Sequence, residues 1–560
     1  MTLVVDDNGE VRIPYAGMEG LRLKTALAGR LGAALKVGKD SLVFPASCLL
    51  MVRDLLPPGI GDHEAVQLAL RVFEDHGRAR SRALEVMETE RVERISEEWL
   101  RRLDPAQSIA VSAMTVPDLL GLCLFDEQGS GKTVMTIAAF DTLKDAGEVD
   151  AMIVVCPKSM VSEWSKDVDR FLPAKYVTVL AEGSRRDRYE AALKNFDILV
   201  TNYEGVEPMR VALSASASRK SYLLVVDESF YLKNAESLRA DMAIRLRASC
   251  KRCFVLCGTP APNSAYDMVN QFDLADRGYT FGMFQKTGGT FDDAERIAAL
   301  VEERGTFIRR LKSDMLQDVP EKHFHVMRAP LRGRQAMMYD KARSELELEL
   351  RGLDNTSFKK KLVTYFQKRA MLLQICACPS SIDPTMTEHS VKLDLLDELL
   401  GDLVPRGRKV ILWSFYRKSL DELTARYGRY NPVRIDGTVD TKSRRDAVRL
   451  FQEDPSRMLF VGNPAAAGAG ITLHAAYDAV YVSYSNQAAH YLQSLDRIHR
   501  RGQISKQVNY YLLVCAGTIE ETEILRLRRK ELEQHSLLGD HVPWPSSLDE
   551  ALKELSFVNI

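Results

Sequence analysis

The stretch "LCLFDEQGSGKTVMTIAAF" (residues 122–140) decides the fold, because an apolar run, a glycine-bearing turn and a helical pattern follow one another directly. A strand–GKT–helix order is typical of a loop that binds phosphate. Its glycines let backbone N–H groups approach phosphate oxygens, and the helix start adds a favourable dipole. We expect Lys132 to reach the β- and γ-phosphates and the Thr133 hydroxyl to bind Mg²⁺. The usual pattern has glycine six residues before the lysine, where Asp126 stands here.

Short apolar runs alternate with helical patterns on both sides of this loop. Between residues 119 and 274 the runs are "LLGLCLF", "AMIVVC", "YVTVLA", "FDILVTNY", "YLLVVD" and "RCFVLCG". The same pattern recurs between residues 409 and 514 in "KVILWSF", "PVRIDG", "RMLFVG", "AVYVSY" and "NYYLLV". Strands alternating with helices predict parallel sheets with crossover connections. We therefore predict an α/β fold with two doubly wound parallel-sheet lobes and helical insertions between them.

The predicted domains follow from these patterns. A small N-terminal α+β domain is expected over residues 1–75, a charged helical linker over 76–102, and the first lobe over 103–275. Helical insertions and an inter-lobe linker are expected over 276–390, the second lobe over 391–530, and a tail over 531–560. Within the insertions, "SFKKKLVTYFQKR" (357–369) has two open interpretations. It is either a helix that faces nucleic acid or a solvated lysine-rich face over an apolar stripe.

The composition is that of a globular protein, with 560 residues, 46% hydrophobic residues, 27% charged residues and a net charge of −1. No apolar run is long enough for a membrane span, and "MTLVVDDNGEVRIPY" (1–15) does not resemble a signal peptide. The nine cysteines stand mostly among apolar neighbours, which indicates reduced core thiols and a cytoplasmic location. This interpretation includes the closely spaced Cys250, Cys253 and Cys257, because no second ligand pair stands nearby.

A second chemical motif stands at the end of an apolar run in "LLVVDESFYLKN" (223–234). Asp227 is placed to bind Mg²⁺, and Glu228 to orient and deprotonate an attacking water. An isolated acidic pair at a strand end occurs by chance, but its combination with a phosphate loop is specific.

The third motif is "YLQSLDRIHRRGQ" (491–503), where we predict Gln493, Arg497, Arg500 and Arg501 on one helical stretch. Fixed guanidinium groups stabilise charge that develops on a transferring phosphate, so Arg497 and Arg500 are candidate arginine fingers.

Together these residues resemble the Swi/Snf-type ATPases of helicase superfamily 2, over about residues 100–530 and in the family's motif order. The matching segments are "LDPAQ" (103–107), "DEQGSGKT" (126–133), "VVCPKSMVSEW" (154–164), "LVTNYEGV" (199–206), "LCGTPAPN" (256–263), "FIRRLKSDMLQDVPEKHF" (307–324), "LLQICACP" (372–379), "VILWSFYRKSLDEL" (410–423), "RIDGTVDTKSRR" (434–445), "NPAAAGAGITLHAA" (463–476) and "DRIHRRGQ" (496–503). The family also has aspartate at the position of Asp126. The resemblance implies two RecA-like lobes and DNA-dependent ATP hydrolysis with Mg²⁺.

The resemblance also implies roles for individual residues. It assigns ATP binding to Gln107, which would read adenine, and to Asp126, Glu127, Gln128, Gly129, Ser130, Gly131, Lys132, Thr133 and Gly470. It assigns coupling between ATP and DNA to the positions of Phe230, Gly258, Thr259 and Gln493. Contacts with the DNA backbone fall to Lys158, Ser159, Thr201, Asn202, Tyr203, Ser414, Arg417, Lys418, Gly437 and Thr472. The implied partner is double-stranded DNA, held with little sequence specificity, together with proteins of a repair or defence assembly.

Departures from the family pattern leave alternatives open. Phe230 stands where the family usually has histidine, Cys257 replaces a usual threonine, and "YSNQAAHYLQSLDRIH" (484–499) is closer to bacterial or phage-borne members. The leading hypothesis is an ATP-dependent translocase on double-stranded DNA. One alternative is an enzyme that separates or anneals strands. Another, favoured by Phe230, is a DNA-binding subunit that uses ATP as a switch and hydrolyses it weakly.

Overall fold

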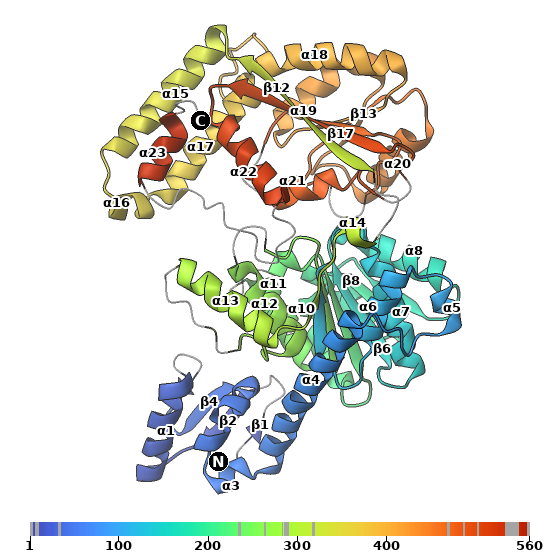
Figure 1. Ribbon diagram of the computed structural model, residues 1–560, viewed down its shortest axis with the longest axis vertical. Helices are drawn as coiled ribbons and strands as arrows, with labels where there is room; N and C mark the ends of the chain where they lie inside the picture. Colours follow the sequence, from blue (N-terminus) through green and yellow to red (C-terminus); the bar gives the residue numbers. More distant parts are fainter. Residues whose placement is uncertain are drawn as a thin grey trace. The chain divides into compact units, whose positions relative to one another are not determined.

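The computed structural model describes residues 4–5, 10–31, 35–232, 234, 237–261, 265–282, 284, 290–315, 320–467, 471–484, 488–500, 503–532 and 548–556. The chain forms two compact units, residues 1–315 and 316–560 (Figure 1). Each unit contains one parallel sheet, and the first also carries a small antiparallel sheet at its N-terminal end. Among the described helices, none combines the length and the apolar character that a membrane crossing requires.

The N-terminal part of the first unit is a four-stranded antiparallel sheet in the order β1-β2-β4-β3. Its strands are β1 (Val4–Val5), β2 (Glu10–Pro14), β3 (Lys36–Val37) and β4 (Ser41–Pro45). Its helices are α1 (Gly17–Leu31), α2 (Leu49–Val52), α3 (Pro58–Gly61) and the long α4 (Glu64–Glu88). The apolar sides of β2, β4, α1 and α4 form one core, which agrees with the α+β arrangement predicted for this region.

The main sheet of the first unit has seven parallel strands in the order β11-β5-β10-β9-β6-β8-β7. The strands are β5 (Gly121–Leu124), β6 (Ala151–Cys156), β7 (Thr178–Ala181), β8 (Ile198–Asn202), β9 (Tyr222–Asp227), β10 (Arg252–Leu256) and β11 (Phe307–Ile308). Central strands such as β6 and β9 are buried along their whole length, as parallel strands covered on both faces require. The apolar runs thus locate β5 to β10 correctly.

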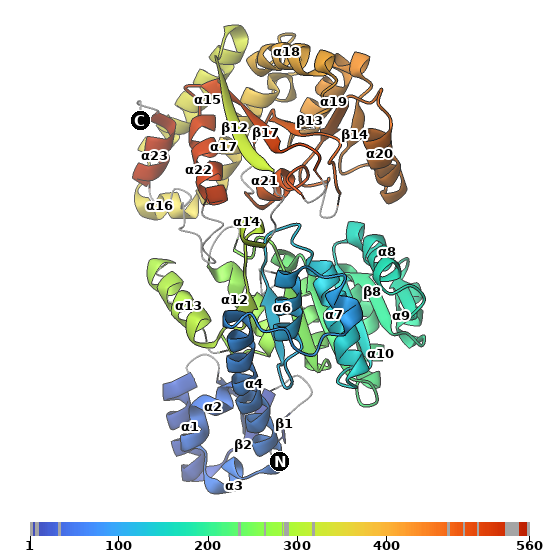
Figure 2. The ribbon, with the colours of Figure 1, turned by 45° about the vertical axis from the view of Figure 1, so that its right-hand side comes forward.

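Helices cover both faces of this sheet (Figures 1 and 2). They are α5 (Glu97–Leu100), α6 (Pro105–Met114), α7 (Lys132–Asp145), α8 (Val161–Phe171), α9 (Arg185–Leu193), α10 (Val206–Ser216), α11 (Leu238–Ala248), α12 (Tyr266–Asp276), α13 (Thr290–Arg304) and α14 (Lys312–Met315). Two-residue β11 was not predicted, because it lies in the expected insertion and is too short to produce a pattern. It adds an edge strand directly beside β5, the strand that precedes the phosphate loop.

The long helix α4 runs without a break across the domain boundary expected at residue 75. Its His76 is fully buried, and the Nδ1 atom accepts a hydrogen bond from the Leu120 backbone N–H at 3.2 Å. The imidazole ring meets the edge of Tyr279 at a centroid distance of 4.8 Å. This helix therefore fastens the N-terminal part to the main sheet of the same unit through buried contacts.

Replacing His76 by glutamine is expected to remove part of the acid sensitivity of the first unit. Burial, with the charges of Arg247, Arg80 and Arg252, lowers the pKa of His76 from 6.5 to about 3. The folded protein keeps the ring neutral, whereas the unfolded chain takes up a proton near pH 6.5. The contribution of His76 to the unfolding free energy is therefore fully present above pH 6.5 and decreases as the pH drops toward 3.

When the pH falls from 7.5 to 5.5, proton uptake by His76 in the unfolded chain lowers the unfolding free energy by about 1.4 kcal/mol. Urea unfolding of the wild type and of His76→Gln at both pH values measures it. His474→Gln offers a control for the substitution itself, since His474 is exposed and lies in the second unit. Equal pH slopes in the wild type and His76→Gln would contradict the prediction.

The second unit contains a six-stranded parallel sheet in the order β12-β17-β16-β13-β15-β14. The strands are β12 (Glu321–Pro330), β13 (Val410–Trp413), β14 (Val433–Ile435), β15 (Leu459–Gly462), β16 (Asp478–Tyr481) and β17 (Gln507–Ala516). The apolar runs predict β13 to β17. They miss β12, because this edge strand is polar and largely exposed and therefore lacks an apolar run.

The described helices of the second unit are α15 (Gly333–Arg351), α16 (Asn355–Lys360), α17 (Leu362–Ala377), α18 (Val391–Leu403), α19 (Arg417–Arg426), α20 (Thr441–Glu453), α21 (Ala488–Leu495), α22 (Glu520–Leu532) and α23 (Leu548–Ser556). Some of them form a group that packs beside the sheet. Figure 2 shows α15, α17, α22 and α23 close together. Ile524 and Leu527 of α22 pack in the core of the sheet, whereas apolar residues of α15, α17 and α23 share one core. Phe358 and Tyr365 point into this core, which favours the solvated-lysine interpretation of residues 357–369.

Buried charges tie this helical group together. Arg369 of α17 is fully buried and forms ion pairs of 2.7 Å with Glu523 of α22 and with Glu554 of α23. Arg526 reaches the same Glu523 from one turn along α22. Helix α23, which lies in the expected C-terminal tail, is therefore part of the packed unit. All nine cysteines are buried and unpaired, in agreement with their apolar sequence neighbours.

Candidate functional site

The phosphate loop lies at the carboxyl end of β5, and Lys132 is the first residue of α7. The Lys132 ammonium group donates to the backbone carbonyl oxygens of Asp126 at 2.9 Å and of Glu127 at 3.3 Å. The Ser130 hydroxyl is buried and meets no hydrogen-bond partner among the described residues. A cationic group, an unsatisfied hydroxyl and the N-terminus of a helix thus converge on one short loop. Such a loop is chemically suited to phosphate oxygens.

Gly131 lets a second motif approach this loop. Its φ of +88° lies in the left-handed region, and a Cβ atom here would come within 2.4 Å of the Gln107 amide nitrogen. That nitrogen donates to the Ser130 carbonyl at 2.9 Å, while the Gln107 amide oxygen accepts from the Asp104 N–H at 3.0 Å. The structure therefore brings the predicted adenine-reading residue against the loop, with its amide already engaged in shaping it.

Two predicted nucleotide residues have a different immediate role. The Asp126 carboxylate is fully buried and accepts hydrogen bonds from Nε and Nη2 of the Arg310 guanidinium, with 3.2 Å between Nε and Oδ1. Glu127 accepts the backbone N–H of Lys312 at 2.9 Å. The side chains of Asp126 and Glu127 thus anchor the segment after β11. Residue-level reasoning missed Arg310 and Lys312, since only tertiary structure brings them beside β5.

The acidic pair lies at the carboxyl end of β9. Asp227 accepts from the Trp164 indole N–H at 2.9 Å through Oδ2 and from the Glu228 N–H at 2.9 Å through Oδ1. The Glu228 carboxylate accepts from the Gln128 side-chain amide at 3.0 Å, which links this pair directly to the phosphate loop. Glu228 has a φ of +53°, an uncommon conformation for a residue with a side chain. Strain of this kind concentrates at functional sites.

Electrostatics indicate that this pair is suited to a cation. Burial, followed by the charge of Glu228, raises the pKa of Asp227 well above its ordinary value, against the opposing effects of Trp164 and Lys132. Two adjacent buried carboxylates repel each other, and a divalent cation relieves that repulsion. Carboxylate and hydroxyl oxygens are the ligands that Mg²⁺ prefers. Asp227 and Thr133 therefore fit the metal that the sequence predicts.

The arginine motif of the second unit lies partly outside a helix. Helix α21 ends at Leu495, so the expected single helical stretch through residue 500 is wrong. The chain leaves the helix because the Arg497 carbonyl accepts from the Leu473 N–H at 3.1 Å. Both arginines nevertheless reach one segment, since Arg497 donates to the Ile471 carbonyl at 3.1 Å and Arg500 to the Thr472 hydroxyl at 2.7 Å. Gln493 is buried on α21, while Gly470 and Arg501 lie outside the described residues.

The predicted DNA residues fall into two groups. Lys158, Arg417, Lys418 and Gly437 are exposed, whereas Ser159 and Thr472 are half-buried. The buried members are Thr201, Asn202, Tyr203 and Ser414. The Tyr203 hydroxyl donates to the backbone carbonyls of Asp227 and Glu228. Burial excludes direct DNA contact by these four side chains in this conformation. The Tyr203 hydroxyl instead fixes the backbone of the acidic loop.

Comparison with known families now decides the classification. Residues 71–381 match the SNF2-related domain, which covers more than half of the chain. The chain belongs to the SNF2-related family. Residues 391–502 also match the helicase conserved C-terminal domain. The first match extends past residue 315 into the second unit, and the second match lies wholly within that unit. The predicted Swi/Snf resemblance is confirmed.

Two relatives are 28% and 29% identical to this chain over the aligned residues. A CHD3-type chromatin-remodeling factor of Arabidopsis thaliana is 28% identical over 77% of this chain and 37% of its own length. The mouse chromodomain-helicase-DNA-binding protein 1-like is 29% identical over 72% of this chain and 46% of its own length. The chain thus spans less than half of either relative. The solved Sulfolobus solfataricus SWI2/SNF2 ATPase core in complex with double-stranded DNA is 21% identical, with a TM-score of 0.36, over 82% of this chain and 97% of that chain.

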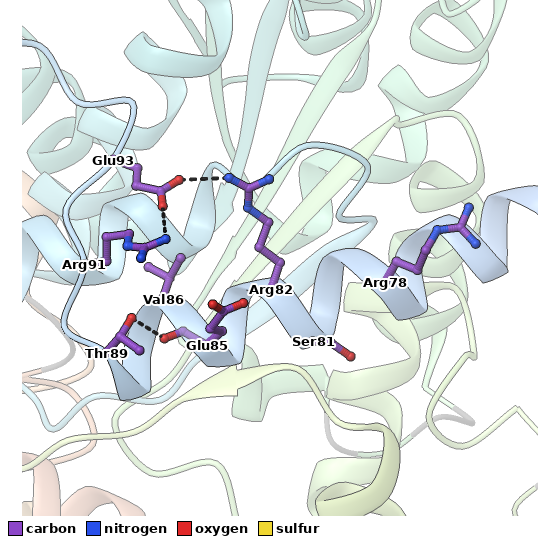
Figure 3. A pocket seen from close by; sticks show the side chains of 8 residues that line it. All are labelled: Arg78, Ser81, Arg82, Glu85, Val86, Thr89, Arg91 and Glu93. Atoms are coloured by element: carbon purple, nitrogen blue, oxygen red, sulfur yellow. Dashed lines mark hydrogen bonds and ion pairs between the residues drawn. The ribbon is translucent and has the colours of Figure 1, made fainter.

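This SNF2-family chain also has a surface hollow away from the phosphate loop. It lies along the end of α4 and is lined by Arg78, Ser81, Arg82, Glu85, Val86, Thr89, Arg91 and Glu93 (Figure 3). Glu93 pairs with Arg82 at 3.1 Å and with Arg91 at 3.4 Å. The acidic and basic groups of this hollow therefore compensate each other.

Proposed function

We propose that this protein is an ATP-dependent translocase on double-stranded DNA that uses ATP and Mg²⁺. The observation that carries the proposal is the link within one unit between the phosphate loop and the acidic pair, made by the hydrogen bond from Gln128 to Glu228. Lys132 follows β5, and Asp227 and Glu228 lie at the end of β9; both strands pair with β10, which supports a common site for the proposed phosphate-binding lysine and the proposed metal-binding carboxylate. Membership of the SNF2-related family supports the same activity.

Each residue has a defined role in the proposed hydrolysis. Lys132 moves from the loop carbonyls to the phosphates, and Ser130 supplies a hydroxyl that is otherwise unsatisfied. Thr133 and Asp227 would hold Mg²⁺, which when bound neutralises charge on the phosphates. Glu228 orients the attacking water and accepts its proton. Arg497 and Arg500 of the second unit are the proposed groups that stabilise charge on the transferred phosphate.

The proposed grip on DNA uses the phosphate backbone. In the first unit it involves Lys158 and Ser159, which lie between β6 and α8. In the second unit Arg417 and Lys418 begin α19, and Gly437 follows β14. Contacts of this kind position a protein on DNA without reading its sequence, so binding should weaken as salt rises. A cytoplasmic setting in bacterial or phage DNA repair or defence, with protein partners, belongs to the same proposal.

ATP turnover with no DNA, with single-stranded DNA and with duplex DNA tests this function. We expect duplex DNA to stimulate turnover by at least about tenfold, in line with coupling free energies of 1–3 kcal/mol between linked sites. The double variant Arg417→Ala/Lys418→Ala should raise the duplex concentration needed for half-stimulation, through lost phosphate contacts. Arg429→Ala is the control, because this exposed arginine stacks on Tyr430 outside the proposed grip.

Three outcomes would redirect the proposal. Stimulation by single strands alone would favour a strand-separating or strand-annealing enzyme. Wild-type turnover equal to that of a Glu228→Gln variant would favour the ATP-switched binding subunit. Equal effects of the Arg417/Lys418 and Arg429 substitutions would remove α19 from the DNA-binding surface.

A further inference from the structure

Two loops meet at the carboxyl edge of the first unit's sheet. One follows β9 and carries Glu228 and Ser229; the other follows β10 and contains residues 258–260. They are neighbours because β9 and β10 pair in parallel, with Asp227 opposite Leu256. Phe230 is buried and stacks on Tyr231 at a centroid distance of 4.4 Å, and a phenyl ring makes no conventional hydrogen bond. The polar connections between the loops therefore use other groups, and the Cys257 thiol beside the Phe230 backbone is one of them.

Gln271 of α12 provides another of these connections. Its amide oxygen accepts from the Ser229 hydroxyl at 2.5 Å, and its amide nitrogen donates to the Pro260 carbonyl at 2.7 Å. The same nitrogen donates to the Asp267 carbonyl one turn earlier on α12, at 2.6 Å. Ser229 and Gln271 are both fully buried. The Gln271 amide oxygen thus binds the loop after β9, and the Gln271 amide nitrogen binds the loop after β10.

Packing alone does not explain an amide at this position. Burying an amide is costly unless its hydrogen bonds are made, and an apolar side chain would fill the same space at no such cost. The neighbouring Phe272 and Leu274 on α12 show that apolar groups suit these surroundings. A buried group that uses both its donor and its acceptor on separate loops fixes the position of one loop relative to the other.

A further connection closes a ring around the site. A Cβ atom at Gly258 would come within 2.7 Å of the Gln128 amide oxygen, so the second loop lies directly against Gln128. Gln128 in turn donates to Glu228. The buried Thr259 hydroxyl has no hydrogen-bond partner among the described residues, so the second loop holds one unused polar group. A shift of the acidic loop is thus transmitted to residues 258–260 through both Gln128 and Gln271.

We propose that Gln271 is a positioning residue that passes movement of the Glu228–Ser229 loop to residues 258–260. This inference rests on the proposed function, because the movement that matters is the one that ATP turnover produces. Gln271 touches neither of the proposed reactants, and it acts through Ser229 and Pro260. Without the amide the acidic loop loses its hydrogen-bonded link to Pro260 and keeps the contact through Gln128, so the response of turnover to DNA weakens.

Kinetics of Gln271→Leu and Ser229→Ala test the proposal. We expect each variant to lower the duplex-stimulated kcat by about tenfold, with the KM for ATP changed less than twofold. The double variant should lose no more than either single variant, because both substitutions break one relay. Ser229→Thr retains the hydroxyl and should recover most of the stimulation. The matched control is Asn270→Leu, since Asn270 is a buried amide on α12 that bonds to Leu232 at 2.5 Å and not to the second loop.

Hydrogen exchange separates this inference from the proposed function. In the nucleotide-free protein, Ser229→Ala should speed amide exchange in peptides that contain residues 257–261, whereas Asn270→Leu should not. Unchanged exchange in Ser229→Ala would overturn the relay even if the wild type is an active ATPase. If Gln271→Leu and Asn270→Leu lowered the stimulation of turnover by duplex DNA equally, Gln271 would have only a packing role. Wild-type turnover equal to that of Glu228→Gln would overturn the proposed function and this inference together.

Discussion

Replacing Glu228 by glutamine is expected to lower ATP turnover by a factor of about 10²–10⁴, with ATP affinity within a few-fold of the wild type. The carboxylate lies at the end of β9, is buried, and is held at 3.0 Å by the Gln128 amide. Glutamine keeps the shape of the side chain and loses the ability to accept a proton. The loss should therefore appear in kcat, because the phosphate loop that binds ATP is unchanged.

Steady-state turnover with duplex DNA, combined with equilibrium binding of a fluorescent ATP analogue, measures both parts of this expectation. The control is Glu190→Gln, which neutralises an exposed carboxylate that pairs with Arg186 at 2.7 Å, away from the proposed site residues. That variant should keep wild-type turnover. If Glu228→Gln hydrolysed ATP at the wild-type rate, another group would have to activate the water.

Replacing Arg369 by methionine is expected to lower the unfolding free energy of the second unit by about 3–5 kcal/mol. The substitution removes the positive charge that pairs with Glu554, which among the described residues keeps only the hydrogen bond from the Tyr365 hydroxyl, and it leaves Glu523 paired with Arg526. Burying a carboxylate without an opposing charge is costly, and this cost weakens the packing of α17, α22 and α23. Helix α23 should be the first element to detach.

Urea unfolding followed by circular dichroism measures the loss. Lys368→Met provides the control on the same helix, because Lys368 is partly exposed and pairs with Glu349 at the surface. Surface pairs of this kind contribute about 0–1 kcal/mol. Equal destabilisation by the two substitutions would show that the buried ion network does not hold α23 in place.

The sequence predicts the central strands of both parallel sheets and the edge strands β7 and β14, but misses the edge strands β11 and β12. The central strands are continuous apolar runs because they are covered on both faces, and β7 is an apolar run although it is only partly covered. The edge strand β12 is polar and exposed, and β11 has only two residues, so neither produces such a run. The continuous helix α4 crosses an expected boundary because charge patterns mark a solvated surface and not the point where a domain ends.

In the candidate site, the sequence likewise predicts local motifs and misses contacts that depend on tertiary structure. The motifs place Lys132, Asp227 and Glu228 at strand ends, because strand–turn chemistry is local in the sequence. The contacts from Arg310 to Asp126 and from Tyr203 to the acidic loop depend on which strands are neighbours. Spacing alone does not contain that information. Ser229 was the polar residue nearest to Phe230, but its partner Gln271 emerges only when α12 is packed against the sheet.

The position of β11 beside β5 has a consequence for biosynthesis. Cys123 and Leu124 pair with Phe307 and Ile308, so the strand before the phosphate loop gains its outer neighbour from the last part of the first unit. A ribosome makes the chain from its N-terminus, and long-range strand pairing waits until both partners have emerged. The nascent chain therefore carries the Asp126 loop for most of this unit's translation before Arg310 arrives. The contact between Arg310 and the Asp126 loop thus forms only at the end of that unit's synthesis.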